Sequence, residues 1–138
     1  MAIVEFALVL PILMLIVVAM LDFGRALNYW ADTTHLSAEG ARFAAVDRIP
    51  DGTSLQTYLR EHADSGELRG DVASDSVPDP VEVCVTSEGD DVGDPVEVSV
   101  STTYHWISLL GIDAPTTITG RSTMRRERVA DNVDDGCE

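Results

Sequence analysis

Glu5 is an ionisable residue inside an otherwise apolar stretch that runs from Met1 to Leu21. A charged group in hydrocarbon costs roughly 3 kcal/mol on insertion scales unless it finds a partner. The nearest candidate partner is an N-terminal ammonium, either that of Met1 in the same chain or that of a neighbouring molecule. Such charge-assisted hydrogen bonds are strong where water competes poorly. The sequence therefore predicts that this helix is an element of assembly, with Glu5 as part of the contact, and more than a plain membrane anchor.

Cys84 and Cys137 are the two cysteines of the chain and make a single possible pair. If the residues after the apolar stretch lie outside the cytoplasm, oxidation is permitted and a disulfide is expected. That bond would tie the acidic tail, Ala130–Cys137, to a strand of the core. In the chain-entropy model it would contribute about 4 kcal/mol. Two unpaired thiols are the alternative.

Catalytic chemistry has little support in this sequence. Its three histidines are scattered: His35, His62 and His105. The chain lacks a nucleophile elbow, a Cys–His signature and a phosphate loop. Acidic residues gather in the loop Glu88–Asp94 and in the tail Asp131–Gly136, but Val133 occupies a calcium-ligand position and no bidentate glutamate follows. We expect solvated acidic turns, and no enzyme, cofactor, metal or small-molecule substrate.

The composition fits one small domain on a long helix. The chain has 138 residues, and its formal net charge of −15 comes almost wholly from the part after Leu21. All nine basic residues are arginines. An acidic exterior repels nucleic acid, so we expect no nucleic-acid partner. At this length there is room for one long helix and one small domain.

The apolar stretch is long enough to cross a membrane as a helix. At about 1.5 Å per residue, Met1–Leu21 reaches roughly 30 Å, the thickness of a hydrocarbon core. A secretory signal peptide is disfavoured because nothing basic precedes Phe6 and Ala19–Leu21 is a poor cleavage site. An ordinary signal anchor, with Glu5 solvated near the interface, is the alternative. Pro11 removes one backbone hydrogen bond and is expected to kink the helix.

The helical pattern continues beyond Leu21 and is expected to end near Ile49–Gly52, which gives one helix from about residue 2 to 48. A stripe of apolar and small residues recurs at steps of three and four: Phe23, Ala26, Leu27, Trp30, Thr34, Ala38, Ala41, Ala44 and Ala45. We expect the upper part of this stripe to carry the chain's own domain and the lower part to pack against other subunits.

Beyond Gly52 the spacing between apolar residues shortens to two, which is the period of a β-strand. The alternation predicts antiparallel strands at Val81–Thr86 and Val96–Tyr104, and a final strand within Thr116–Glu127. Before them we expect a short helix within Thr53–Ser65, capped by Thr53 or Ser54. We expect His105–Gly111 to form a compact apolar turn. The predicted fold is α+β, a long N-terminal helix packed at its C-terminal half against a small antiparallel sheet. It divides into residues 1–21, 22–50 and 51–138.

Three blocks now carry a family resemblance: Val4–Pro11, Leu21–Arg25 and Ala38–Ala45. They resemble, in the same order, the TadE/TadG-like pilins of the tight-adherence (Tad/Flp) branch of type IV pili. The resemblance covers roughly the first third of the chain. It implies assembly roles for Met1, Glu5, Phe6 and Pro11, with Met1 as the residue exposed by leader cleavage. It also implies a membrane boundary at Asp22 and Arg25.

The function implied by this resemblance is that of a pilin or pseudopilin. Such a subunit is stored in the cytoplasmic membrane with its acidic domain outside, and is then assembled into an extracellular filament with itself or sibling pilins. The implied partners are a prepilin peptidase, a membrane platform and a secretion ATPase. Major pilins of this branch are shorter, which favours a minor role. The alternative is a membrane-anchored extracytoplasmic binding module that does not polymerise.

Overall fold

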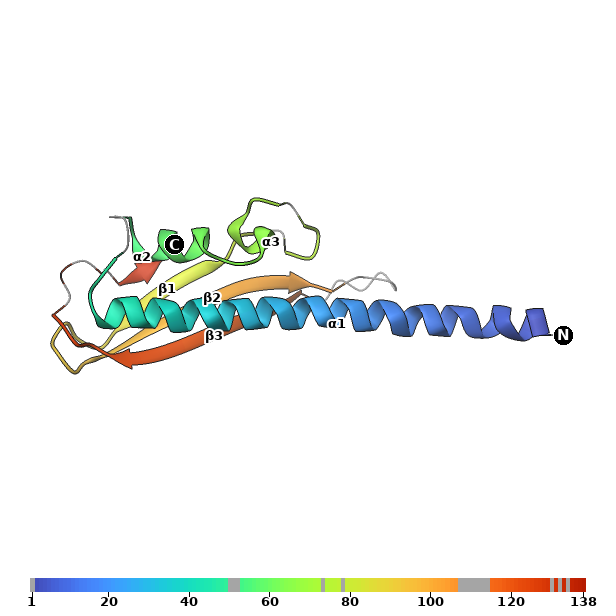
Figure 1. Ribbon diagram of the computed structural model, residues 1–138, viewed down its shortest axis with the longest axis horizontal. Helices are drawn as coiled ribbons and strands as arrows, with labels where there is room; N and C mark the ends of the chain where they lie inside the picture. Colours follow the sequence, from blue (N-terminus) through green and yellow to red (C-terminus); the bar gives the residue numbers. More distant parts are fainter. Residues whose placement is uncertain are drawn as a thin grey trace.

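The computed structural model describes residues 2–49, 53–72, 74–77, 79–106, 115–129, 131, 133 and 135–138. Helix α1, Ala2–Ala45, runs the length of the molecule, and a small domain lies along its C-terminal half (Figure 1). The predicted long helix is confirmed, and so is the α+β class with the helix packed on an antiparallel sheet. The N-terminal half of α1 projects beyond the domain.

Helix α1 ends about three residues earlier than the sequence predicted, because Asp47 stops it. Asp47 adopts a positive φ of 49°, the left-handed conformation that commonly closes helices. Its N–H donates to the Ala44 carbonyl, and the Arg48 N–H donates to the Phe43 carbonyl at 3.2 Å. These two bonds satisfy carbonyls that the helix end would otherwise leave open. The proline and glycine expected to end the helix, at 50 and 52, lie outside the described residues.

The sheet contains four described strands in the order β3-β2-β1-β4. They are β1 (Glu82–Ser87), β2 (Pro95–His105), β3 (Pro115–Arg125) and β4 (Gly136–Cys137), and every pairing is antiparallel. The three predicted strands are confirmed to within one or two residues at most ends. The short edge strand β4 was not predicted, because two residues carry no recognisable alternation.

One face of the sheet packs on the C-terminal half of α1 through small side chains and valines. Val83 and Val85 of β1 and Val98 of β2 are fully buried there. Gly120 of β3 marks the closest approach, because a Cβ at this position would lie 2.4 Å from the Thr33 carbonyl oxygen. Gly40 has the same role on the helix side, where a Cβ would lie 2.9 Å from a methyl carbon of Val98 in β2. Two glycines therefore set how closely sheet and helix approach.

Two short helices cover the remaining edge of the core (Figure 1). Helix α2, Leu55–Glu61, is capped by Ser54, whose hydroxyl accepts from the Thr57 N–H at 3.1 Å. The predicted short helix and its cap are thus confirmed, although the helix is shorter than the predicted range. Helix α3, Gly66–Arg69, was not predicted and buries Leu68. Of the predicted turn at His105–Gly111, only the first two residues lie within the described part.

The predicted stripe on α1 is buried in its upper part and mostly exposed in its lower part. Ala41, Ala44 and Ala45 are buried as predicted, but five members of the stripe are exposed: Phe23, Leu27, Trp30, Thr34 and Ala38. Ala26 of the stripe is also buried, and the other buried residues in this part of the helix are polar as well as apolar: Asp22, Tyr29, Thr33, Leu36 and Ser37. The chain's own sheet thus leaves the lower part of the stripe uncovered, and the expected packing of that part against other subunits stays a prediction.

Candidate functional site: the uncovered face of the N-terminal helix

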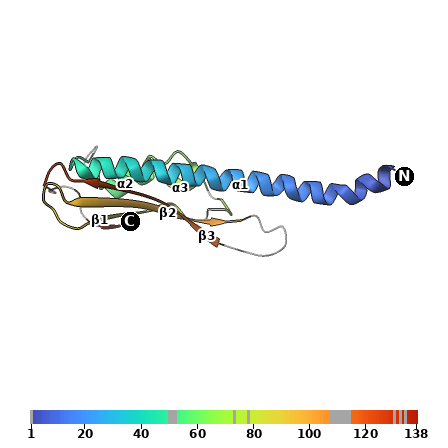
Figure 2. The same cartoon turned by 90° about the horizontal axis from the view of Figure 1, so that it is seen from below.

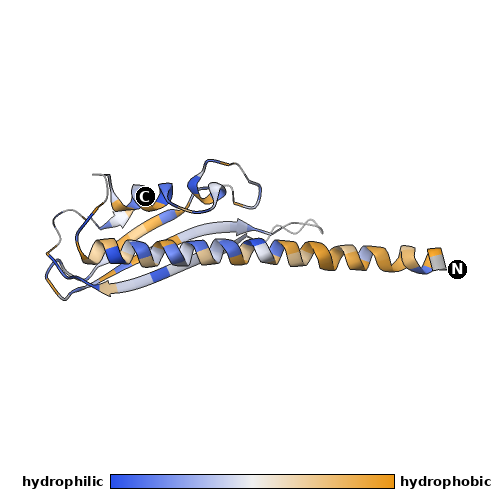
Figure 3. Cartoon of the chain, viewed as in Figure 1, coloured by the Kyte–Doolittle hydropathy of each residue, from blue (hydrophilic) through white to orange (hydrophobic). Residues whose placement is uncertain are grey.

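The N-terminal half of α1 is apolar and has no cover within the described chain. Nearly all large apolar residues from Ile3 to Leu21 are exposed, from 84 % of the full accessible surface at Ile3 to 39 % at Leu10, and Val18 is half-buried. Figure 3 shows this half of the helix as a nearly continuous hydrophobic cylinder, while the half beside the sheet is mixed. By length and composition it is the one helix among the described residues able to cross a membrane.

Glu5 lies exposed in the first turn of α1, where a negative charge interacts favourably with the helix dipole. The first basic residue along the helix is Arg25, about 30 Å away at 1.5 Å per residue. Intramolecular pairing of Glu5 with a described basic side chain is therefore excluded by distance. Met1, whose amino group is the other candidate partner, lies outside the described residues. An N-terminal ammonium, of the same chain or of a neighbouring molecule, therefore stays the expected partner.

Phe6 and Pro11, the other residues assigned to assembly, both lie in this exposed segment. Phe6 is 62 % exposed, next to the Glu5 carboxylate in sequence. Pro11 lies inside α1, which continues through it without a break. Figure 2 shows a shallow bend in the exposed part of the helix, as expected where a proline removes a backbone hydrogen bond.

An exposed stripe on one face of α1 connects Glu5 with the half of the helix beside the sheet. Phe23 follows Glu5 by about five turns at 3.6 residues per turn, so the two share a face. Leu27 and Trp30 extend that face past the membrane-length segment, and Trp30 is 54 % exposed. We call Glu5, Phe23, Leu27 and Trp30, with the apolar residues between them on this face, the uncovered stripe.

The two proposed boundary residues occupy different environments. Asp22 is buried against the sheet domain, and Tyr104 at the end of β2 donates its hydroxyl to the Asp22 carboxylate. The same hydroxyl lies 3.2 Å from the Asp22 carbonyl oxygen. Arg25, less than one turn further, is exposed. Asp22 thus fixes the sheet to the helix at the point where the helix leaves the domain.

Tyr104 belongs to an aromatic cluster at this junction. Its ring centroid lies 5.7 Å from that of Tyr29 and 5.2 Å from that of Trp106. Burial, and then the hydrogen bond with Asp22, raise the pKa of the Tyr104 hydroxyl well above its usual range. Tyr29 of α1 is itself buried in this cluster. The strand alternation that places Val98 and Val100 inward also places Tyr104 inward, which is the signal that identifies it.

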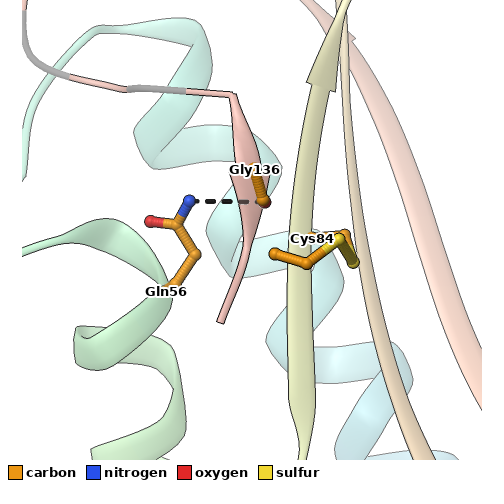
Figure 4. The surroundings of a disulfide bond; sticks show 4 residues. Gln56, Cys84 and Gly136 are labelled. Carbon is orange, nitrogen blue, oxygen red and sulfur yellow. Dashed lines mark hydrogen bonds between the residues drawn. A yellow bond between two sulfur atoms is a disulfide. The ribbon is translucent and has the colours of Figure 1, made fainter.

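The Cys84–Cys137 disulfide is present and joins β1 to β4 (Figure 4). It is not the tail's only attachment. Gln56 of α2 donates to the Gly136 carbonyl at 3.5 Å, and the Asp47 carboxylate accepts from the backbone N–H groups of Asp131 and Val133. The disulfide expected from the sequence is thus confirmed, and these hydrogen bonds attach the tail as well.

The acidic loop between β1 and β2 is exposed but tied to the end of β3. The Gly93 N–H donates to the Arg126 carbonyl at 2.8 Å, and the Arg126 N–H donates to the Asp94 carbonyl. The Arg126 side chain is buried, and among the described residues its nearest anionic atom is an Asp90 carboxylate oxygen at 4.0 Å. The Asp94 carboxylate accepts from the Asp91 N–H within the loop. Its acids thus help to form a compact turn.

The structure defines an α+β protein with a membrane-length helix whose N-terminal half is uncovered. Comparison with protein families agrees: a family model described as TadE-like protein matches residues 1–42. The resemblance stated from the sequence is thereby confirmed over this segment. Comparisons with curated proteins and with solved structures find no match. The matched segment is nearly the whole of α1 and includes the uncovered stripe.

Proposed function

We propose that this protein is a structural pilin or pseudopilin of a Tad-type type IV pilus. The observation that carries the proposal is the uncovered stripe, an apolar helix face that includes one acid and lies within the TadE-like segment. In the cytoplasmic membrane, the apolar half of α1 spans the bilayer with the acidic domain outside. In the filament, the same half packs against the helices of other subunits. The role is structural, without catalysis.

Glu5 acts in this proposal as the register element between neighbouring helices. Its carboxylate pairs with the N-terminal ammonium of an adjacent subunit, because no described basic side chain of its own chain lies within reach. The partners are copies of this chain or sibling pilins. A prepilin peptidase, a membrane platform and a secretion ATPase would process and move the subunit, as the family resemblance implies. After assembly the subunit belongs to an extracellular filament.

The extension of the uncovered stripe beyond Leu21 supports packing between subunits over mere anchoring. A bilayer anchor requires apolar residues only within the hydrocarbon thickness. Phe23, Leu27 and Trp30 lie beyond that thickness, beside the chain's own sheet, and stay exposed. Exposed apolar residues that form a continuous face are typical of contact surfaces. In the filament this face is buried by the helix of a neighbour.

The test is Glu5→Ala, compared with Glu39→Ala on the same helix. Insertion of the Glu5→Ala chain should be retained or improved, because a charge is removed from hydrocarbon. Incorporation into filaments should be lost, with Glu5→Gln intermediate and Glu39→Ala at the parental level. Filament yield and membrane fractionation are measured side by side. Parental polymerisation of Glu5→Ala would refute the assembly role, and a parental chain found only in membranes would favour the non-polymerising binding module.

A further inference from the structure

A groove lies between α1 and the α2–α3 connection, beside the end of the apolar segment. It has a volume of about 670 Å³, within the range of small-molecule sites. Met20, Leu21 and Gly24 line it without polar side chains, and the other lining residues are polar: Arg25, Asn28, Tyr29, Asp64, Ser65 and Glu67. One cation and two carboxylates therefore face a space whose lower edge is the end of the membrane-length helix.

The rim of this groove is held in place by a buried acid. The Asp32 carboxylate accepts from the Ser65 N–H at 2.9 Å and from the Asp64 N–H at 3.2 Å, and its residue is only 6 % exposed. The Asn28 amide reaches the Ser65 hydroxyl at 3.5 Å. These contacts fix the α2–α3 connection on α1, so the groove is formed before any ligand arrives.

The charged groups of the groove are close enough to influence one another. Burial, and then the Glu67 carboxylate, raise the pKa of the Tyr29 hydroxyl, while Arg25 opposes the shift. Arg25 and Glu67 both line the groove with Tyr29, one offering donors and the other acceptors. A groove that contains both charges matches a ligand that carries both signs.

We propose that this groove binds the head group of a bilayer phospholipid with a primary ammonium, such as phosphatidylethanolamine. Arg25 donates to the phosphate, and the Glu67 and Asp64 carboxylates accept from the ammonium. A quaternary choline has no N–H to donate, and an anionic head group meets two carboxylates without offering a cation. The groove therefore selects the ethanolamine head group.

The bilayer is the source of this ligand because the groove opens onto the apolar half of α1. Below it, Leu21, Val17, Met14 and Leu10 share one helix face at steps of four, three and four, and all are exposed. An acyl chain lies along that face while the head group occupies the groove. This face is distinct from the uncovered stripe, so lipid and neighbouring subunit bind without competing. The inference rests on the membrane placement in the proposed function, but not on polymerisation.

The test is native mass spectrometry of the full chain, released from micelles that contain equimolar phosphatidylethanolamine, phosphatidylcholine and phosphatidylglycerol. We expect the chain to retain about fivefold more phosphatidylethanolamine than either of the other two lipids. A fivefold preference corresponds to the net contribution of one or two hydrogen bonds. Glu67→Gln should equalise the ethanolamine and choline lipids. Arg25→Gln should reduce retention of both, and Glu39→Gln, outside the groove, should match the parent. Unchanged urea midpoints show that the variants are folded.

Two outcomes would overturn the site. The first is equal retention of the three lipids by the parental chain. The second is a preference for phosphatidylethanolamine that persists in both Glu67→Gln and Arg25→Gln. Flotation of the parental chain with phospholipid vesicles separates this failure from failure of the proposed function. A chain that floats without lipid preference loses only the groove assignment. A chain that does not float loses its membrane placement, and this site with it.

Discussion

The two halves of α1 are one continuous helix, but their side chains are covered in different ways. The N-terminal half exposes nearly every apolar residue, whereas the C-terminal half buries a face that includes Asp22, Asp32 and Thr33. The half that looks suited to a protein core is the one without cover, and the more polar half packs on the sheet. Hydrophobicity alone therefore does not assign the contact face of a helix. The shape of the partner does, because a sheet that approaches closely needs small residues.

Gly120→Ala should reduce stability more than the other substitutions, because it separates the C-terminal half of α1 from its sheet. The new Cβ would lie 2.4 Å from a backbone oxygen of Thr33, and backbone atoms cannot move aside as a flexible side chain can. We expect a loss of roughly 5 kcal/mol in the free energy of unfolding, or no folded domain. Urea unfolding of the full chain in micelles, followed by near-UV circular dichroism, measures it. A parental midpoint would show that the sheet approaches the helix less closely than we describe.

Removal of the disulfide should cause the second largest loss of stability. The bond closes a loop with a sequence separation of 53 residues, for which the chain-entropy model gives about 4 kcal/mol. We expect the Cys84→Ser, Cys137→Ser double variant to lose about that much, while the helical signal of the N-terminal half stays. Intact mass before and after reduction and alkylation establishes the bond in the parent. Two thiols that alkylate without reductant would contradict the pairing.

Tyr104→Phe tests the junction between the two halves. The variant removes the hydroxyl that donates to the buried Asp22 carboxylate, at an expected cost of about 2 kcal/mol. The sheet should then detach first from the helix near Asp22, which hydrogen exchange at that turn would detect. Asp22→Asn is the companion variant, because it keeps an acceptor but not the charge. Equal exchange in the parent and in Tyr104→Phe would exclude this role.

The same tyrosine gives the protein an expected alkaline sensitivity. The pKa of Tyr104 is raised in the folded state above its ordinary value of 10.0. As pH rises, the Tyr104 hydroxyl therefore loses its proton in the unfolded chain before it does so in the folded protein. The contribution of Tyr104 to the free energy of unfolding is complete below about pH 10 and declines as pH rises towards the folded pKa. Tyr104→Phe should show a shallower decline over that range. A residual slope is expected from Tyr29, whose pKa is also raised.

Gly24→Ala should have the smallest effect on stability, and this effect should be stabilising. Gly24 lies on an exposed face of α1, and a Cβ there would meet nothing within 4 Å. Alanine should stabilise the helix by up to about 1 kcal/mol, because glycine is the poorer helix former. With Gly120→Ala it forms a matched pair, the same substitution on the exposed and on the packed side. Strong destabilisation by Gly24→Ala would mean that this face is covered after all.

The sequence by itself determined the long helix, the short helix α2, the three longer strands and the apolar character of the N-terminal half. Unbroken apolarity around Glu5 is a local property, so the long helix and its TadE-like segment were readable residue by residue. Period-two alternation likewise located β1, β2 and β3. The cysteine pairing followed because only one pair exists.

Only the tertiary structure decided which face of α1 packs on the sheet and what holds the two together. The fit depends on Gly120 against Thr33 and on Tyr104 reaching Asp22, contacts between residues far apart in sequence that no periodicity encodes. The groove at Arg25 and Glu67 likewise exists because Asp32 holds the α2–α3 connection on the helix. Backbone approach and buried polar pairing depend on three-dimensional position, whereas periodicity reports only how often an apolar residue recurs.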